Sequence, residues 1–300
     1  MMSLDSIRGF FPENLRGRQF DRHLLKEYVE CLALEWISKS EWAAKLTFIG
    51  GTNLRLIHDI DRFSEDLDFD TKGLTHEEFI RMTDALIVYL QRNGLPAVAK
   101  DRESDELTAF RRSILFPGLL KNLGLSAFAE ERFLMKIETQ DQEFAYERQM
   151  ASVAKCGFFF PVAVPPDPVL CSMKLSALLT RAKGRDFYDA MFLLMRTKPD
   201  YGYLSFREGI HNAAELKAAL LRKVGEVSID NKKRDVEHLL FSATAAEKIP
   251  AFAAFVEKLQ KTMKLIVMMA GVALVGAARM EREGARHEGG LVALGLQSQV

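Results

Sequence analysis

The stretch FIGGTNLRLIHDIDRFSEDLDFD, residues 48–70, decides the fold of this 300-residue chain. Acidic and apolar residues alternate at its end, and a period of two is typical of a β-strand. This pattern places Asp66, Asp68 and Asp70 on one face and turns Leu67 and Phe69 toward a core. Two carboxylates about 4 Å apart repel each other by about 4 kcal/mol at an effective dielectric near 20. A divalent cation between them would remove that repulsion.

The beginning of the stretch complements this strand. A short apolar run, residues 46–49, ends at Gly50 and Gly51, and Thr52 follows where a helix begins. Backbone without Cβ atoms lets a phosphate approach closely, and the N–H groups at a helix start favour negative charge. Mg²⁺ and Mn²⁺ prefer carboxylate oxygens and keep positions open for water and phosphate. We therefore predict that the turn holds phosphates and that Asp66 and Asp68 hold the bridging metal.

Each half also has a plainer interpretation. A lone Asp-x-Asp pair is commonly a solvated strand face, and a lone Gly-Gly pair is commonly a turn. Their presence together in one strand–turn–helix–strand unit favours phosphate-and-metal chemistry. Asp70, at the strand end beside Thr71 and Lys72, keeps the structural interpretation. The sequence contains no Walker, Rossmann, zinc or nucleophile-elbow motif that competes with this hypothesis.

Residues 50–52, 54–56 and 62–69 resemble the nucleotidyltransferase AbiEii/AbiGii toxin family, part of the DNA polymerase β-like nucleotidyltransferase superfamily. The resemblance implies an α/β (α+β) fold, with a polymerase β-like nucleotidyltransferase domain followed by a helical domain. The sheet is expected to be mixed and largely antiparallel. The resemblance also implies that Gly50, Gly51 and Thr52 bind a triphosphate and that Asp66 and Asp68 bind two metal ions.

A second predicted strand, RFLMKIET at residues 132–139, carries Lys136 and Glu138 on one face. If it lies beside Asp66 and Asp68, Glu138 becomes the third carboxylate, which activates the attacking hydroxyl in two-metal transfer. Spacing alone suits a surface pair of Lys136 with Glu138 equally well. The Lys-Ile-Glu resemblance to the family favours the metal-binding role.

The segment CSMKLSALLTRAKGRDFYDAMFLLM, residues 171–195, contains the other candidates. Lys174 interrupts an apolar helix face and needs a partner if it is partly buried. A phosphate at the glycine turn would serve, whereas a lysine that snorkels to the surface would not need one. By resemblance, Lys174 grips the triphosphate, and Asp189 orients Lys174 or the base. Asp186 is expected to cap a helix, and the nearby cations either guide an RNA acceptor or form a solvated face: Arg181, Lys183 and Arg185.

Composition limits the remaining possibilities. The 41 basic and 41 acidic residues balance, so any nucleic-acid contact requires a local patch. The three cysteines are far apart, which argues against a disulfide framework and predicts a cytoplasmic location. The apolar run 265–278 is shorter than the roughly 20 residues of a membrane span, so we expect no membrane association.

We predict a nucleotidyltransferase domain over residues 1–165, including an N-terminal helix at 21–38. A helical domain over 166–264 is expected to complete the nucleotide site, with helices at 169–182, 186–197, 204–223, 231–242 and 247–262. Thr75-x-x-Glu78 predicts a capping box that opens a helix ending near Asn93. Residues 101–105 are expected to form a charged turn. The apolar segment and Gly-rich tail at 265–300 have no assigned role.

The predicted reaction is transfer of NMP from an NTP to an acceptor hydroxyl, with release of pyrophosphate. The resemblance implies the toxin of a toxin–antitoxin or phage-defence (abortive infection) system that acts on tRNA or other RNA, with its antitoxin encoded nearby. Transfer to a protein or a small molecule is the alternative enzyme hypothesis. A non-catalytic nucleotide-binding module is the alternative of another class.

Overall fold

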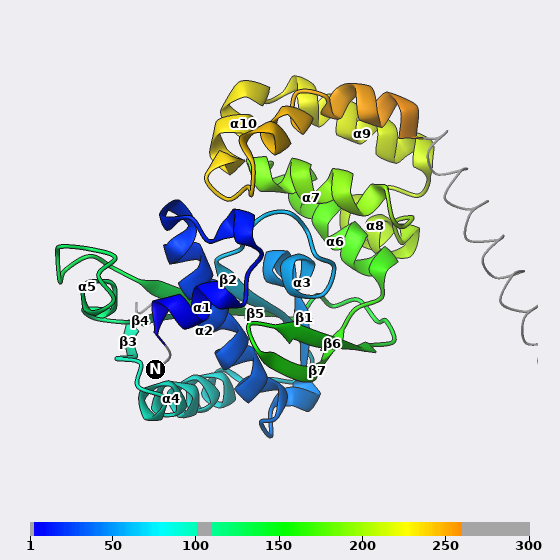
Figure 1. Ribbon diagram of the computed structural model, residues 1–300. Coiled ribbons are helices and arrows are strands. Elements are labelled where there is room, and N and C mark those ends of the chain that lie inside the picture. Colours follow the sequence, from blue (N-terminus) through cyan, green and yellow to red (C-terminus); the bar gives the residue numbers. More distant parts are fainter. Residues whose placement is uncertain (1–2, 101–109, 260–300) are drawn as a thin grey trace, which may run out of the picture.

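A five-stranded mixed sheet forms the centre of the protein (Figure 1). The computed structural model describes residues 3–100 and 110–259. The strands lie in the order β1-β2-β5-β4-β3, with bounds β1 Leu46–Ile49, β2 Asp66–Thr71, β3 Val98–Lys100, β4 Phe110–Leu115 and β5 Leu134–Gln140. Only the β2–β5 pairing among these is parallel. The prediction of a mixed, largely antiparallel sheet is therefore confirmed.

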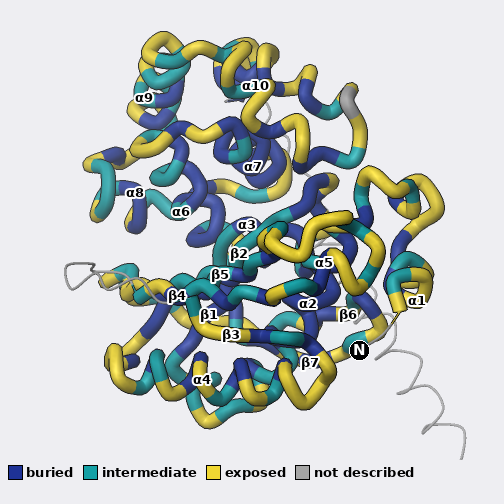
Figure 2. The backbone as a smooth tube through the Cα atoms, turned by 90° about the vertical axis from the view of Figure 1, so that its left-hand side faces the viewer, coloured by how far each residue is buried: buried dark blue, intermediate teal, exposed yellow. Residues whose placement is uncertain are grey.

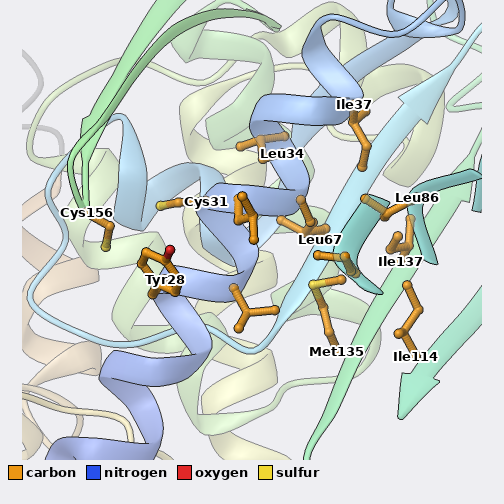
Figure 3. Close-up of a cluster of buried hydrophobic side chains, with 14 of the residues drawn as sticks. Tyr28, Cys31, Leu34, Ile37, Leu67, Leu86, Ile114, Met135, Ile137 and Cys156 are labelled. Carbon is orange, nitrogen blue, oxygen red and sulfur yellow. The ribbon is translucent and has the colours of Figure 1, made fainter. Parts of the chain in front are cut away.

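One face of the sheet is covered by α2 (Asp21–Ser38) and α4 (His76–Arg92). Figure 3 shows Cys31 and Leu34 of α2 lying near Leu67 of β2, with Met135 and Ile137 of β5 beside them. All five side chains are buried. Burial of an aliphatic side chain of this size contributes about 1.5–3 kcal/mol. The alternation that turns Leu67 into this core turns its acidic neighbours to the opposite face.

The N-terminus of α4 has the predicted local structure. The Thr75 hydroxyl accepts from the Glu78 N–H, and the Glu78 carboxylate accepts from the Thr75 N–H. This capping box is a short-range feature, and the sequence alone identified it. The helix ends at Arg92, one residue before the predicted end.

Smaller elements complete this half of the molecule. The helices are α1 (Leu4–Gly9), α3 (Gly50–Leu56) and α5 (Leu119–Asn122). The hairpin of β6 (Gln149–Lys155) and β7 (Phe158–Val164) forms a separate two-stranded sheet that packs against α2 and β1. The acidic side chains of β2 alternate with the buried Leu67 and Phe69, so they lie on the sheet face away from α2 and α4.

A helical assembly with its own hydrophobic core lies over that other face (Figure 1). It contains α6 (Asp167–Thr180), α7 (Gly184–Leu194), α8 (Tyr201–Glu208), α9 (Ala213–Gly225) and α10 (Ile229–Glu237), followed by helical residues 252–259. Helix α7 is buried along almost its whole length (Figure 2). Leu54 and Ile60, from the sheet half of the chain, also belong to this core.

The prediction of one helix over 204–223 is wrong. Gly209 adopts φ 67° and ends α8, a backbone conformation that glycine tolerates best. Asn212 then accepts from the N–H groups of Ala214 and Glu215 and begins α9. The predicted charged turn at 101–105 and the segment 265–300 lie outside the described residues. The domain boundaries remain a prediction.

Two negative findings concern the whole described chain. None of the helices within residues 3–100 and 110–259 is long and apolar enough to cross a membrane. The three cysteines, all in the described part, are free and buried.

Candidate active site

The parallel pairing of β2 with β5 brings the predicted carboxylates together. Asp68 is the register partner of Glu138, and Asp66 is the register partner of Lys136. Paired residues on adjacent strands point to the same face, so these side chains share the face opposite the α2–α4 core. Glu138 therefore lies beside Asp66 and Asp68, as we predicted.

The glycine turn lies directly against Asp68. Gly50 has φ 83°, and a Cβ atom there would lie 2.1 Å from Oδ2 of Asp68. A Cβ atom on Gly51 would lie 2.6 Å from the Ser64 hydroxyl. Both positions therefore exclude a side chain because other functional groups already occupy that space. The absence of Cβ atoms therefore lets the turn pack directly against Asp68 and Ser64.

Thr52 holds the turn in place. Its buried side chain donates a hydrogen bond to the carbonyl oxygen of Asp66 at 2.6 Å. The hydroxyl thus fastens the start of α3 to the start of β2. Because the Thr52 hydroxyl is engaged in this way, only the backbone N–H of Thr52 is left for the predicted binding of phosphate.

Two of the three carboxylates at this site are placed to bind a divalent cation, and the third is engaged by an arginine. Oδ1 of Asp66 is buried, accepts no hydrogen bond within the described chain, and lies 3.4 Å from Nζ of Lys136. Glu138 is occupied, since Arg111 Nε lies 2.6 Å from one oxygen and Arg111 Nη2 donates to the other at 3.0 Å. Among residues 3–100 and 110–259, no three acidic, histidine or cysteine side chains converge on one point. Asp66 and Asp68 are therefore the pair suited to a metal, and Glu138 joins them only if Arg111 moves.

Burial raises the pKa of Asp68 to about 6, although the positive charge of Lys174 opposes the shift. The neighbouring carboxylates Asp66 and Glu138 raise it further. Ionisation of Asp68 thus costs more free energy than that of an exposed aspartate, and a bound cation would offset this cost. Repulsion between carboxylates, which the sequence predicted, is present in the folded protein.

Lys174 belongs to a buried ionic triad. Its Nζ lies 2.9 Å from Asp189 of α7. Arg62 donates to the same carboxylate through Nε at 2.6 Å and Nη2 at 2.7 Å. All three residues are buried. The triad joins the loop before β2 to α6 and α7, and it fixes Lys174 beside Asp68.

Burial by itself would raise the pKa of Asp189, but Arg62 and Lys174 lower it to about 2. Asp189 is therefore a permanent anion that holds two cations. The structure places it against Lys174, the first of the two alternatives implied by the resemblance.

A basic cavity of about 220 Å³ connects these groups. Three carboxylates line it, Asp66, Asp68 and Glu138, together with Gly51 and Ser64. Seven cationic side chains also line it: Arg62, Arg111, Lys136, Lys174, Arg181, Lys183 and Arg185. An excess of positive charge beside a carboxylate pair suits a polyanionic ligand that is bound together with a metal.

The sequence profile described as "Nucleotidyl transferase AbiEii toxin, Type IV TA system" matches residues 32–262, well over half of the chain. The chain belongs to the AbiEii family. It is a nucleotidyltransferase toxin of a type IV toxin–antitoxin system. This membership confirms the family resemblance that the glycine turn and the acidic strand indicated.

Solved structures are similar to this chain over most of its length. MenT4, a nucleotidyltransferase toxin from Mycobacterium tuberculosis H37Rv, shares 15% identity at a TM-score of 0.57, over 89% of this chain and 99% of MenT4. JHP933 from Helicobacter pylori shares 16% identity at a TM-score of 0.48, over 84% of this chain and 97% of JHP933. No curated protein matches the chain.

The charged residues at 181–186 of this AbiEii chain fall into two groups. Some form ion pairs or cap a helix, and the others do neither. Asp186 accepts from the Lys183 N–H at 2.9 Å and from two nitrogens of Arg181 at 3.0 and 2.9 Å. It therefore caps α7, as predicted. The side chains of Lys183 and Arg185 form no ion pair with any described residue. These two cations remain available at the cavity wall.

A larger cleft, which we call the mixed cleft, adjoins the basic cavity in this AbiEii fold. It measures about 470 Å³ and shares Asp68, Glu138, Lys174 and Arg181 with the basic cavity. Its other walls come from β5, α6, α8 and the segment after β5. Asp68 and Glu138 thus lie at the boundary between two cavities of different chemistry, whereas Asp66 lines the basic cavity alone.

Sequence reasoning missed Arg62 and Arg111. Arg62 lies within the matching stretch, but its partner is 127 residues later in the chain. Arg111 reaches Glu138 only through the β4–β5 register. Neither contact could be predicted from the spacing of residues in the sequence. The sequence did offer one signal for Arg62: it stands next to Phe63, an apolar residue expected to be buried, within Arg-Phe-Ser-Glu-Asp-Leu-Asp.

Proposed function

We propose that this toxin transfers NMP from an NTP to a hydroxyl of RNA, with tRNA as the favoured acceptor, in a metal-dependent reaction. The observation that supports this most is the acidic pair Asp66–Asp68 lying between the glycine turn and the basic cavity. Part of the wall of the basic cavity carries carboxylates that suit a metal ion, and the rest of that wall carries cations that suit phosphate. That combination is what phosphoryl-group chemistry requires.

Asp66 and Asp68 are the residues to hold Mg²⁺ or Mn²⁺, with Glu138 as a third ligand. A bound metal ion of this kind supplies Lewis-acid activation of the acceptor hydroxyl and neutralises phosphate charge. Oδ1 of Asp66 accepts no hydrogen bond within the described chain, and its ion pair with Lys136 is long at 3.4 Å. This and the raised pKa of Asp68 both support a cation there. Release of Glu138 from Arg111 is then part of assembling the loaded site.

The chain's own residues bind and orient the triphosphate. Gly50 and Gly51 let the backbone approach Asp68, Ser64 and Arg62 closely, which brings the first N–H groups of α3, including that of Thr52, to the wall of the basic cavity where phosphate would bind. Lys174 and the basic cavity balance the charge of the β- and γ-phosphates, and Asp189 positions Lys174. The acceptor hydroxyl loses its proton to solvent as its oxygen forms a bond to the α-phosphorus, and the bond from that phosphorus to the bridging oxygen of the β-phosphate breaks. Pyrophosphate leaves through the basic cavity.

Lys183 and Arg185 are the candidates for contact with the RNA acceptor. Phosphodiester backbones bind to Lys and Arg largely through charge, and these two cations form no ion pair within the described chain. In a protein without net charge, such a local group suffices for an encounter with RNA. We also propose that the toxin acts in the cytoplasm in phage defence by abortive infection. The antitoxin that family membership implies is encoded nearby.

The test is incubation of the purified protein with Mg²⁺, each α-³²P-labelled NTP in turn and total cellular RNA, followed by a denaturing gel. Asp66→Ala removes a metal ligand, and Asp230→Ala, on exposed α10 surface, is the matched control. We expect label in an RNA band with the wild type and Asp230→Ala but not with Asp66→Ala. A labelled protein band with unlabelled RNA would show protein modification instead. Full activity of Asp66→Ala would contradict the assignment of the acidic pair.

A further inference from the structure

We propose that the mixed cleft receives the nucleoside of the NTP and that Glu208 selects bases that carry an exocyclic amino group. The inference rests on the proposed function, because it assigns the part of the substrate that the basic cavity does not hold. The two chambers meet at Asp68 and Glu138. A nucleotide whose α-phosphate lies at this boundary has its triphosphate on one side and its nucleoside on the other.

The walls of the mixed cleft differ from those of the basic cavity. Ile49, Phe69, Leu170 and Met173 give it an apolar lining that the basic cavity does not have. A base has apolar faces and polar edges, and ligand pockets of this kind pair apolar walls with a few placed polar groups. Met173, partly exposed on α6 beside Lys174, is an adaptable side chain for packing against such a ring.

Gln142 supplies one fixed polar group at the edge of the cleft. The Tyr203 hydroxyl donates to Oε1 of Gln142 at 2.8 Å. Arg207 Nη2 donates to the Gln142 carbonyl oxygen at 2.8 Å and lies 3.5 Å from the same Oε1. Because two donors point at this oxygen, the amide is oriented with its NH₂ group on the other side. That NH₂ group donates to no described residue and can donate to a base.

Glu208 supplies the complementary group. One carboxylate oxygen of Glu208 accepts a hydrogen bond from the Ser176 hydroxyl, and the other accepts none from the described chain. Glu208 forms no ion pair within residues 3–100 and 110–259. A carboxylate accepts but does not donate, so it favours a base edge that presents an amino group. Cytosine, adenine and guanine have one, whereas uracil has carbonyl oxygens at its exocyclic positions, and its N3–H lies between these two oxygens, which a carboxylate repels.

Charge argues against the RNA acceptor as the occupant. Nucleic-acid backbones require cations along their path. The mixed cleft carries three carboxylates, Asp68, Glu138 and Glu208, against three cations. Two of these cations, Lys174 and Arg181, already form ion pairs with buried aspartates, so only Arg207 has no carboxylate partner in the described chain. The available cations Lys183 and Arg185 line the other chamber. A neutral base therefore fits this cleft better than a phosphodiester chain does.

The first experiment separates the two chambers by equilibrium binding. The ligands are α,β-methylene analogues of the four NTPs and inorganic tripolyphosphate, each with Mg²⁺. Met173→Trp fills the cleft, and Met150→Trp, an exposed residue of β6, is the matched control. We expect Met173→Trp to weaken all four analogues at least tenfold while tripolyphosphate affinity stays within about twofold. Met150→Trp is expected to bind every ligand as the wild type does.

The second experiment tests Glu208. We expect the wild type to bind the cytosine, adenine and guanine analogues about tenfold or more tightly than the uracil analogue, as for hydrogen bonds to charged groups. Glu208→Gln can both donate and accept, so it is expected to reduce that ratio to nearly one. An unchanged ratio in Glu208→Gln overturns the assignment of selectivity.

Other outcomes distinguish this inference from the proposed function. If Met173→Trp spares analogue binding but stops label transfer to RNA, the cleft holds the acceptor and the inference is overturned while the proposed function stands. If Met173→Trp changes neither, the cleft has no part in substrate binding, and the inference is again overturned. If the wild type binds neither tripolyphosphate nor any analogue, both the proposed function and the inference fail.

Discussion

At the scale of single residues, Gly50 links the backbone of the turn to the chemistry of Asp68. Its φ of 83° and the 2.1 Å approach of a Cβ atom to Oδ2 of Asp68 are two separate reasons for glycine. We predict that Gly50→Ala reduces nucleotidyl transfer by about a hundredfold, because the methyl group displaces the carboxylate. The measurement is the rate of label transfer, with a thermal unfolding curve as a check of folding.

Gly73 provides the matched control for that variant. It has a φ of 65°, yet a Cβ atom there would meet nothing within 4 Å. Gly73→Ala carries the backbone penalty alone, about 1–2 kcal/mol of stability, and should keep wild-type activity. Equal loss of activity in the two variants would show that backbone strain, and not contact with Asp68, explains the result.

Asp68 also predicts a pH dependence. Its pKa, raised to about 6 by burial, means that the metal-free folded protein favours the protonated acid below that pH. The stabilising contribution of protonated Asp68 is present at low pH and is lost as the pH rises toward and through 6, where a cation can replace the proton. We expect Mg²⁺ to raise the melting temperature at pH 7.5 and to have progressively less effect below pH 6.

Asp68→Asn cannot ionise, so its smaller response to Mg²⁺ should no longer change around pH 6. A wild-type response to Mg²⁺ of equal size at pH 5 and pH 7.5 would contradict the predicted linkage. The measurement is a melting curve by differential scanning fluorimetry at each pH.

At the scale of elements, α10 packs against the start of α7 without room for a side chain. A Cβ atom on Gly184 would lie 2.0 Å from the carbonyl oxygen of Lys232, and the Gly184 N–H donates to Asp235 at 2.7 Å. We predict that Gly184→Ala lowers the free energy of unfolding by about 1–3 kcal/mol, since backbone must move to admit the methyl group. Urea unfolding followed by circular dichroism measures this change.

Gly225, the last residue of α9, is the control for that substitution. A Cβ atom there would meet nothing within 4 Å, so Gly225→Ala should leave stability unchanged or raise it by about 0.5–1 kcal/mol. Destabilisation of the same size in both variants would show that crowding at Lys232 is not the cause.

Elements with local signals were predictable from the sequence, and contacts between distant elements were not. The alternation in β2, the capping box at Thr75 and the glycine turn each depend on a few adjacent residues. The break at Gly209 was missed because a single glycine within an apolar periodic segment is also tolerated inside a helix. The Arg111–Glu138 pair depends on strand register, which no short window of sequence contains.

At the scale of the whole molecule, the triad of Arg62, Lys174 and Asp189 joins the sheet half to the helical half. Removal of its anion leaves two buried cations without compensation. We predict that Asp189→Asn lowers the free energy of unfolding by about 3–5 kcal/mol. Glu247→Gln, which breaks an exposed pair with Lys233, should change it by less than about 1 kcal/mol.

Chemical denaturation of the two variants in parallel measures this difference. A change below about 1 kcal/mol for Asp189→Asn would show that the triad contributes little to the junction between the halves. Nucleotide binding by the same variant reports whether Lys174 keeps its position when its buried partner loses charge.

The separation of Arg62 from Asp189 by 127 residues also bears on how the protein is made. Translation adds about 5–20 residues per second, so the glycine turn and acidic strand leave the ribosome several seconds before α7 does. During that interval Arg62 has no anion to hold it and Lys174 has no anchor. A nascent or prematurely terminated chain that ends before α7 therefore lacks the assembled pocket, and the cell meets the toxic activity only in chains that have been synthesised past residue 189.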